Sequence, residues 1–182
     1  MPYIILDRDG VINYESENYI KSPEEWIPIP GSLDAIAQLN RYGFRVLIVT
    51  NQSGVARGFY DLHTLDEIHE KLMHELASVG GYIEEIFFCP HHPDEKCDCR
   101  KPEPGLFYQI EKKYPIKFSE TYFIGDSLND MQVAETVGCM SVLVLSGKGQ
   151  QTLENNPELR DIPNFPDLAG AVEYVISRSR SE

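Results

Sequence analysis

The chain has 182 residues, of which 42% are hydrophobic and 25% are charged, a composition typical of one globular domain with a full core. Its 29 acidic residues outnumber its 16 basic ones, and the formal net charge of −13 argues against a broad electrostatic grip on nucleic acid. No apolar run approaches the roughly 18 residues of a membrane helix, and the N-terminus lacks the basic leader of a signal peptide. We therefore expect a cytoplasmic protein without membrane partners, whose four cysteines are reduced.

Apolar runs alternate with helical patterns along the whole chain. The apolar runs predict five strands, over residues 3–6, 45–49, 83–89, 121–124 and 141–145. The apolar periodicity between and after them predicts helices over residues 33–42, 64–76, 106–113, 128–137 and 168–178. We expect Ser32 to cap the first helix, and Thr64 with Glu67 to form a capping box at the second. Residues 177–182 are expected to form a frayed tail.

Hydrophobicity in these strands is continuous rather than alternating, which is typical of a parallel sheet covered by helices on both faces. The sequence thus predicts a doubly wound, Rossmann-like, three-layer α/β/α fold, built as a single domain over residues 1–182. The connections are too short for a large cap domain, so we expect a comparatively open active site. No exposed apolar helix face requires a partner, and we expect a monomer.

Polar residues follow four of the predicted strands. They are Asp7-Arg8-Asp9-Gly10, Thr50-Asn51-Gln52-Ser53-Gly54, Arg100-Lys101-Pro102 and Gly125-Asp126-Ser127-Leu128-Asn129-Asp130. Because ligands of open α/β sheets bind beyond the carboxyl ends of the strands, we interpret these residues as one site. Any single aspartate could equally cap a helix or a turn, but four strand ends agree.

The residue types at these strand ends suit phosphoryl chemistry. Asp7, Asp9 and Asp126 would repel one another strongly unless a cation lay among them, and hard oxygen ligands suit Mg²⁺. The ammonium of Lys101 and the hydroxyl of Thr50 would stabilise the charge of a phosphoryl group. A carboxylate can be the nucleophile that forms an aspartyl-phosphate, and a second one can act as acid and then as base.

In order and content, the four motifs resemble those of the haloacid dehalogenase superfamily phosphatases. The resemblance implies that Asp7 is the nucleophile and Asp9 the general acid/base, and that Thr50 and Lys101 hold the transferring phosphoryl group. It also implies a Mg²⁺ site made of the Asp7 carboxylate, the backbone carbonyl of Asp9 and the Asp126 carboxylate. Asp130 would support the metal ligands rather than bind the ion.

A second group of ligands lies between the third strand and the lysine. Cys89-Pro90-His91 is followed after five residues by Cys97-Asp98-Cys99, and two close pairs of soft ligands suit tetrahedral zinc. Since all four ligands would be side chains, the zinc would be structural. Spacing alone does not choose between His91 and His92. A disulfide conflicts with the expected cytoplasmic location, and one between Cys97 and Cys99 would close a strained small ring. Unrelated buried cysteines are the remaining alternative.

This zinc loop over residues 89–99 narrows the resemblance. With Arg100-Lys101-Pro102 it resembles the heptose 1,7-bisphosphate 7-phosphatase family, whose zinc ligands correspond to Cys89, His91, Cys97 and Cys99. The histidinol-phosphatase branch carries a similar loop, but residues 51–58 are similar to the heptose family. The resemblance implies removal of the 7-phosphate of D-glycero-D-manno-heptose 1,7-bisphosphate, in the synthesis of nucleotide-activated heptose for lipopolysaccharide. Histidinol-phosphate phosphatase is the alternative.

A sugar bisphosphate needs a second cationic contact for its other phosphate. Arg100 is the best candidate, because its planar guanidinium can bind phosphate through two hydrogen bonds. Arg57 and Lys148 could help, although each could equally be a solvated surface residue. Further substrate contacts are expected from Arg8, Glu15, Ser16, Glu17, Asn18, Tyr19, Asn51, Gln52 and Ser53.

Other interpretations and motifs carry less weight. A DNA 3′-phosphatase conflicts with the net charge, and a zinc-stapled binding module without catalysis conflicts with the presence of every reacting group. His69 and His74 lie about 140° apart around a helix, so they cannot share a metal ion and are expected on a solvated helix. Gly147-Lys148-Gly149 matches no phosphate-binding loop and is expected to be a mobile loop.

Overall fold

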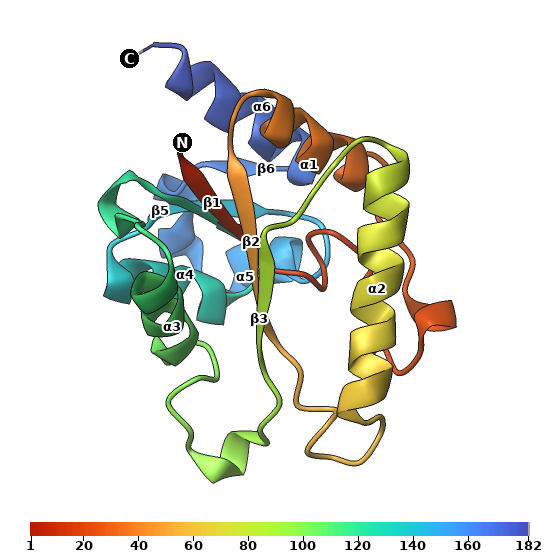
Figure 1. The fold of residues 1–182 in the computed structure, drawn as a ribbon. Coiled ribbons are helices and arrows are strands. Elements are labelled where there is room, and N and C mark those ends of the chain that lie inside the picture. The colour runs from red at the N-terminus through yellow and green to blue at the C-terminus, as the bar shows by residue number, and fades with distance from the viewer. Residues whose placement is uncertain (182) are drawn as a thin grey trace.

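The computed structural model describes residues 1–181, and its centre is a sheet of six strands, each parallel to its neighbours (Figure 1). Their order is β3-β2-β1-β4-β5-β6. The strands are β1 (Tyr3–Leu6), β2 (Arg45–Asn51), β3 (Glu85–Cys89), β4 (Tyr122–Gly125), β5 (Met140–Val144) and β6 (Asn164–Phe165). The α-helices are α1 (Ser32–Arg41), α2 (Leu62–Ser78), α3 (Gly105–Lys113), α4 (Leu128–Val137), α5 (Gly149–Asn155) and α6 (Leu168–Ser179). Short 3₁₀ helices cover Pro23–Glu25, Pro93–Glu95, Phe118–Glu120 and Pro157–Asp161.

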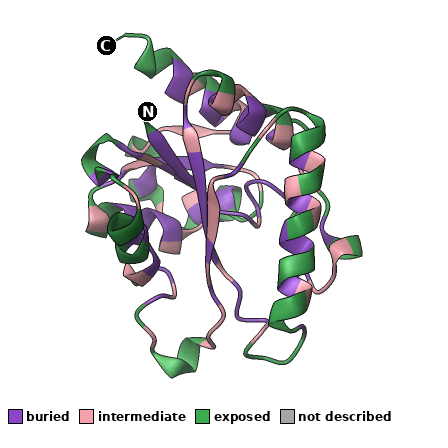
Figure 2. Cartoon of the chain, in the orientation of Figure 1, coloured by how far each residue is buried: buried purple, intermediate pink, exposed green. Residues whose placement is uncertain are grey.

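Successive strand residues point to opposite faces of the sheet, and this alternation builds two cores. Ile4 and Leu6 of β1 join the core beneath α1, α2 and α6, whereas Tyr3 and Ile5 join the core beneath α3 and α4. The strands are largely buried, while the helices expose their outer faces (Figure 2). The predicted doubly wound three-layer fold is therefore confirmed. No helix within residues 1–181 is long and apolar enough to cross a membrane.

Both predicted helix caps are wrong. Gly31, with φ at 85°, is the N-cap of α1, and the Ser32 hydroxyl instead donates a hydrogen bond to the Ile12 carbonyl at 2.6 Å. Helix α2 begins at Leu62, because the Asp61 side chain accepts the Thr64 backbone N–H at 2.8 Å. The N-terminus of α1 therefore has no side-chain cap, whereas Asp61 satisfies that of α2 three residues before Thr64.

Two elements in the C-terminal part of the chain, and the end of the last helix, also differ from the prediction. Helix α5 and strand β6 are not predicted, since α5 is mostly polar and β6 has only two residues. Helix α6 runs to Ser179, so the frayed tail expected from residue 177 is wrong for its first residues, and Glu182 lies outside the described chain.

The carboxyl edge of the sheet gathers the chain segments of the predicted site. The segment after β1 lies between those after β2 and β4, because β1 pairs with both strands. The loop that follows β3 extends beyond the sheet before it returns to α3 (Figure 1).

Candidate active site

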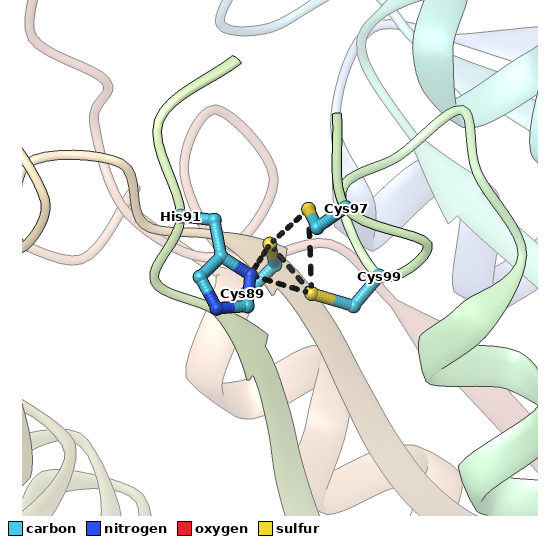
Figure 3. A group of neighbouring side chains, drawn as sticks. All are labelled: Cys89, His91, Cys97 and Cys99. Atoms are coloured by element: carbon cyan, nitrogen blue, oxygen red, sulfur yellow. Dashed lines mark hydrogen bonds between the residues drawn. The ribbon is translucent and has the colours of Figure 1, made fainter. Parts of the chain in front are cut away.

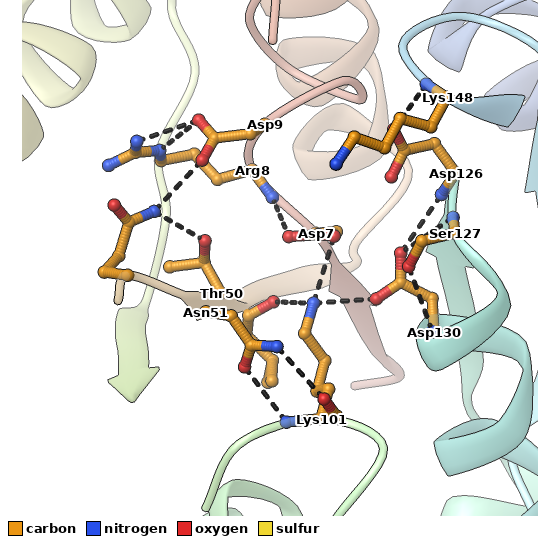
Figure 4. Close-up of polar contacts among 12 residues, drawn as sticks. Asp7, Arg8, Asp9, Thr50, Asn51, Lys101, Asp126, Ser127, Asp130 and Lys148 are labelled. Carbon is orange, nitrogen blue, oxygen red and sulfur yellow. Dashed lines mark hydrogen bonds and ion pairs between the residues drawn. The ribbon is translucent and has the colours of Figure 1, made fainter. Parts of the chain in front are cut away.

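Lys101 is the buried cation at the centre of this edge. Its Nζ lies 3.0 Å from Oδ2 of Asp7 and 2.7 Å from Oδ1 of Asp130, and donates to the Val49 carbonyl at 3.0 Å (Figure 4). Asp7 directly follows β1, Val49 lies within β2 and Asp130 lies in the first turn of α4. Lys101 is 2% exposed, so the pairs are shielded from water. The side-chain amide of Asn51 holds the backbone of Lys101 in place. Its Nδ2 donates to the Lys101 carbonyl at 3.1 Å, and its Oδ1 accepts the Lys101 N–H at 3.0 Å.

Asp126 and Asp130 form the other side of the cluster. Oδ2 of Asp130 accepts the backbone N–H groups of Asp126 and Ser127 at 3.1 and 3.2 Å, while Oδ1 accepts Lys101. Both oxygens of Asp130 are therefore engaged within the protein. Asp126 accepts only the backbone N–H of Lys148 through Oδ2, at 2.9 Å, and its other oxygen has no protein donor within residues 1–181.

The electrostatics of this cluster fit a divalent cation. Oxygen atoms of Asp7, Asp126 and Asp130 lie within 4.8 Å of one another. Burial and then the charge of Asp130 raise the pKa of Asp7 well above its usual value and that of Asp126 to about 7. Burial also raises the pKa of Asp130, but the Lys101 ammonium and the hydrogen bonds of Asp130 together outweigh it, and the net shift is downward. One ammonium for three carboxylates leaves excess negative charge, and hard oxygen donors suit Mg²⁺.

Two glycines leave room for this acidic cluster. A Cβ atom on Gly10 or on Gly147 would collide with the Asp126 carboxylate, and both residues have positive φ, of 81° and 57°. Gly147 and the Lys148 amide pack against Asp126, and Gly149 begins α5. The segment predicted to be a mobile loop, residues 147–149, is therefore a turn beside Asp126 that leads into a helix.

Asp9 is turned away from Lys101 and lies in a network of donors (Figure 4). Its Oδ1 accepts Arg8 Nε and Nη2 at 2.9 and 2.8 Å and Asn13 Nδ2 at 2.9 Å. Its Oδ2 accepts Gln52 Nε2 at 3.1 Å, and the same nitrogen bonds Thr50 Oγ1 at 2.9 Å. Burial raises the pKa of Asp9, but Arg8 and these hydrogen bonds outweigh it and lower the pKa overall.

A cavity of about 280 Å³ opens onto these groups. Its lining includes most of the residues predicted to bind substrate, namely Asp7, Asp9, Glu15, Ser16, Glu17, Tyr19, Thr50, Asn51, Gln52, Ser53, Arg100 and Lys101, and also Ile20, Arg57, Asp126, Ser127, Asn129 and Lys148. Two predicted residues do not line it. Arg8 is completely buried behind Asp9, and Asn18 is exposed outside the cavity.

The cations of the cavity differ in what already holds them. Arg57 lies over the Tyr19 ring, 5.7 Å from its centroid, and Lys148 lies 3.6 Å from Glu15. Within residues 1–181 the Arg100 side chain has no hydrogen bond or ion pair. Arg100 is therefore the cavity arginine whose guanidinium is free for a ligand.

The cysteine–histidine cluster, made of Cys89, His91, Cys97 and Cys99, lies at the end of β3 and on the loop that follows it (Figure 3). Sγ of Cys89 lies 3.5 Å from that of Cys97 and 2.8 Å from that of Cys99, and Cys97 and Cys99 are 3.6 Å apart. Nδ1 of His91 lies 3.6 Å from Cys89 and 3.2 Å from Cys99. Tetrahedral zinc with bonds near 2.3 Å needs donors about 3.7 Å apart, so the set is compatible with zinc.

Of the two candidate histidines, His91 lies in the cluster and His92 does not. The ring of His92 instead caps the 3₁₀ helix that follows it, by accepting the Asp94 backbone N–H at 3.0 Å. All cysteines are free thiols, and Cys139 lies apart from the cluster in the core beneath α3 and α4.

Sequence reasoning missed two polar groups behind the cavity. His69 is expected on a solvated helix face, but it is 8% exposed and its Nε2 lies 3.1 Å from Nη1 of Arg8. Tyr60 donates to Oε1 of Gln52 at 2.6 Å. The available signal for His69 was its place among Leu65, Leu72 and Leu76, which share the apolar face of one helix.

The fold and the four strand-end motifs define a haloacid dehalogenase (HAD)-like hydrolase. The model of the HAD-hydrolase-like family matches residues 98–171. A protein of Pseudomonas putida named D-glycero-β-D-manno-heptose-1,7-bisphosphate 7-phosphatase is 51% identical, over 97% of this chain and 100% of its own length. One of Pseudomonas aeruginosa with the same name is 47% identical, over 95% and 97%. The chain belongs to the D-glycero-β-D-manno-heptose-1,7-bisphosphate 7-phosphatase family.

A solved structure supports this placement. The D,D-heptose 1,7-bisphosphate phosphatase of Bordetella bronchiseptica, crystallised with magnesium and phosphate, superposes with a TM-score of 0.94 at 44% identity. The match covers 98% of this chain and 99% of that one. The resemblance of the sequence motifs to this family is thereby confirmed.

Proposed function

We propose that this protein is a Mg²⁺-dependent phosphatase that converts D-glycero-β-D-manno-heptose 1,7-bisphosphate to heptose 1-phosphate and inorganic phosphate. The observation that carries the proposal is the Asp7–Lys101–Asp130 cluster, which opens into a polar cavity with an unpaired arginine. The names of the relatives supply the sugar and the β anomer. This activity would serve the synthesis of nucleotide-activated heptose, in the reducing cytoplasm that free thiols require.

In this proposal Asp7 attacks the phosphorus atom of the 7-phosphate. Lys101 and Thr50 hold the transferring phosphoryl oxygens, and the buried ammonium offsets the charge that they gain. Asp9 gives its proton to the leaving sugar oxygen as the bond from phosphorus to that oxygen breaks. Asp9 then takes a proton from the water that hydrolyses the aspartyl-phosphate, which regenerates the Asp7 carboxylate.

Two metals are part of the proposal. The carboxylates of Asp7 and Asp126 and the backbone carbonyl of Asp9 would hold Mg²⁺, which when bound supplies positive charge beside the phosphoryl oxygens. The engagement of both Asp130 oxygens by protein donors supports its role in holding neighbours rather than the ion. Residues Cys89, His91, Cys97 and Cys99 would hold a structural Zn²⁺, since four side chains fill its coordination.

Arg100 would bind the 1-phosphate. The side chain lines the same cavity as Asp7 and has no partner among residues 1–181, so a phosphate would complete its hydrogen bonding. The cavity residues between the two ends, including Glu15, Tyr19 and Gln52, would contact the sugar hydroxyls. We propose that the enzyme acts as a monomer on this small substrate.

The proposal is tested by measuring phosphate release, with Mg²⁺, from both anomers of the heptose bisphosphate and from histidinol phosphate. We expect the highest kcat/KM for the β-bisphosphate. A preference for histidinol phosphate would leave the catalytic cluster in place but overturn the substrate. No release from any of the three would overturn the phosphatase assignment itself.

The role of Arg100 is tested with Arg100→Gln and heptose 7-phosphate, which lacks the second phosphate. We expect the variant to lower kcat/KM for the bisphosphate about 30-fold, because a charge-assisted contact contributes about 2 kcal/mol. The monophosphate should react equally well with both enzymes. Arg57→Gln is the matched control in the same cavity, and an equal loss there would remove the special role of Arg100.

A further inference from the structure

A buried chain of hydrogen bonds joins helix α2 to Asp9. His69 Nε2 lies 3.1 Å from Nη1 of Arg8, and Arg8 holds Oδ1 of Asp9 through Nε and Nη2. Arg8 is completely buried and His69 is almost so. We infer that His69 is a positioning residue, which fixes Arg8 and through it the carboxylate of Asp9, an inference that rests on the phosphatase activity proposed above.

A neutral acceptor is what Arg8 requires at this point. A guanidinium has only donor groups, so Nη1 donates and Nε2 of His69 accepts, which leaves the imidazole proton on Nδ1. Burial, and then the charge of Arg8, lowers the pKa of His69 to about 3, in accord with a neutral ring. Without this acceptor Nη1 would be buried and unpaired. A carboxylate here would satisfy Nη1 but would compete with Asp9 for the guanidinium.

The network makes the two oxygens of Asp9 different. Oδ1 accepts three N–H groups, two from Arg8 and one from Asn13, whereas Oδ2 accepts only the neutral amide of Gln52. Protonation of Oδ1 would break a charge-assisted bond, so Oδ2 is the oxygen that is protonated when Asp9 acts as the acid. Oδ2 gives this proton to the sugar oxygen as Asp7 attacks, and takes one back from the water that cleaves the aspartyl-phosphate.

The competing explanation is a core histidine that only stabilises the helix. His69 shares its face of α2 with Leu65, Leu72 and Leu76, so any replacement could affect folding. The two roles differ in their dependence on the leaving group. A positioning role through Asp9 matters when the departing oxygen needs a proton, as a sugar alkoxide does, and matters little for a nitrophenolate, which leaves without one.

The experiment compares His69→Leu, which removes the acceptor, with His69→Gln, whose Oε1 can accept from Nη1. His74→Leu is the control, because His74 is exposed on the same helix. The first turnover of each enzyme is followed with the heptose bisphosphate and with p-nitrophenyl phosphate. This isolates phosphorylation of Asp7 from the later hydrolysis, in which Asp9 acts on both esters.

For His69→Leu we expect phosphorylation by the sugar ester to slow about 30-fold, part of the 10²–10⁴ that a general acid contributes. Its rate with p-nitrophenyl phosphate and its KM should stay within about 3-fold. His69→Gln and His74→Leu should match the wild-type protein on both esters. Should His69→Leu not fold, His69→Met fills the site without a strong acceptor and takes its place.

Each other result overturns a definite statement. Equal losses on the two esters, no loss on either, or a loss in His69→Gln as large as in His69→Leu would each refute the positioning role. If the wild-type protein hydrolyses neither ester, the proposed function itself is wrong.

Discussion

The carboxylate cluster (Asp7, Asp126 and Asp130) and the cysteine–histidine cluster lie at the same edge of the sheet, yet they are assembled in opposite ways. The donors of the first come from two segments, Asp7 after β1 and Asp126 with Asp130 after β4, which the parallel pairing of these strands brings together. The donors of the second all come from the zinc loop, residues 89–99. The Lys101 ammonium lies within the first cluster, whereas the side chains of the second contact one another.

This difference supports the proposed roles of the first cluster as a reacting site and of the second as a structural one. Asp7 and Asp126 of the carboxylate cluster line the cavity. The excess negative charge of the cluster favours a bound cation, to which substrate oxygens can also coordinate. The cysteine–histidine cluster offers four donors, which would leave no open position on the proposed zinc ion. We therefore expect damage to the first to remove activity while the fold persists, and damage to the second to weaken the fold first.

The largest expected effect is that of Asp7→Asn. Loss of the nucleophile should lower kcat/KM by at least about 10⁴-fold, roughly 5.5 kcal/mol of transition-state stabilisation. The Tm should hold or rise, because the pKa of Asp7 is raised by burial and by neighbouring carboxylates and an amide removes that repulsion. Phosphate release and thermal unfolding measure the two effects. Activity above about 1% of wild type would rule out Asp7 as the nucleophile.

Lys101→Met should affect both activity and stability. It leaves the buried carboxylates of Asp7 and Asp130 without their ammonium, and breaking such a buried pair costs about 3–5 kcal/mol. The Tm in a chelator should therefore fall by about 6–20 °C for a chain of this size. Added Mg²⁺ should restore more of the Tm in the variant than it adds to wild type. An equal gain in both proteins would argue that the ion lies elsewhere.

The architecture and the gathering of the candidate site residues at one sheet edge could be predicted because each has a local signal. Continuous apolar strands indicate a parallel sheet, and Asp7, Asp9, Lys101 and Asp126 follow strands in an order that the sheet must bring together. Helix ends were less accessible, since Gly31 rather than Ser32 is the N-cap of α1 and Asp61 rather than Thr64 is that of α2, shifts of one and three residues.

The supporting contacts could not be predicted, because they join residues far apart in the chain. His69 meets Arg8 across 61 positions, and Asp126 meets the Lys148 amide across 22. A histidine within an apolar face signals burial, but its partner depends on how α2 packs on the sheet. The pattern likewise gives no sign that Arg8 lies behind Asp9 rather than in the cavity.

Removal of one zinc ligand should have a moderate effect, visible in stability rather than chemistry. We compare Cys97→Ala with Cys139→Ala, since Cys139 is the more buried residue and lies outside the cluster. Packing alone would make Cys139→Ala the costlier change. Loss of a zinc ligand should instead make Cys97→Ala costlier, by about 2–3 kcal/mol or a Tm lower by roughly 4–12 °C. Metal analysis should find zinc in the wild-type protein and in Cys139→Ala, but not in Cys97→Ala. Absence of zinc from the wild-type protein would refute the proposed structural ion.

The smallest effect is expected for Gly10→Ala, compared with Gly138→Ala. Both glycines have nearly the same positive φ, 81° and 83°, so both variants carry a similar backbone cost of about 1–2 kcal/mol. A Cβ atom on Gly138 meets nothing within 4 Å, whereas one on Gly10 would collide with the Asp126 carboxylate. The Mg²⁺ concentration for half-maximal activity should therefore rise about tenfold in Gly10→Ala, near 1.4 kcal/mol, and stay constant in Gly138→Ala. An equal shift in both variants would show that backbone strain, rather than displacement of Asp126, sets the affinity for the ion.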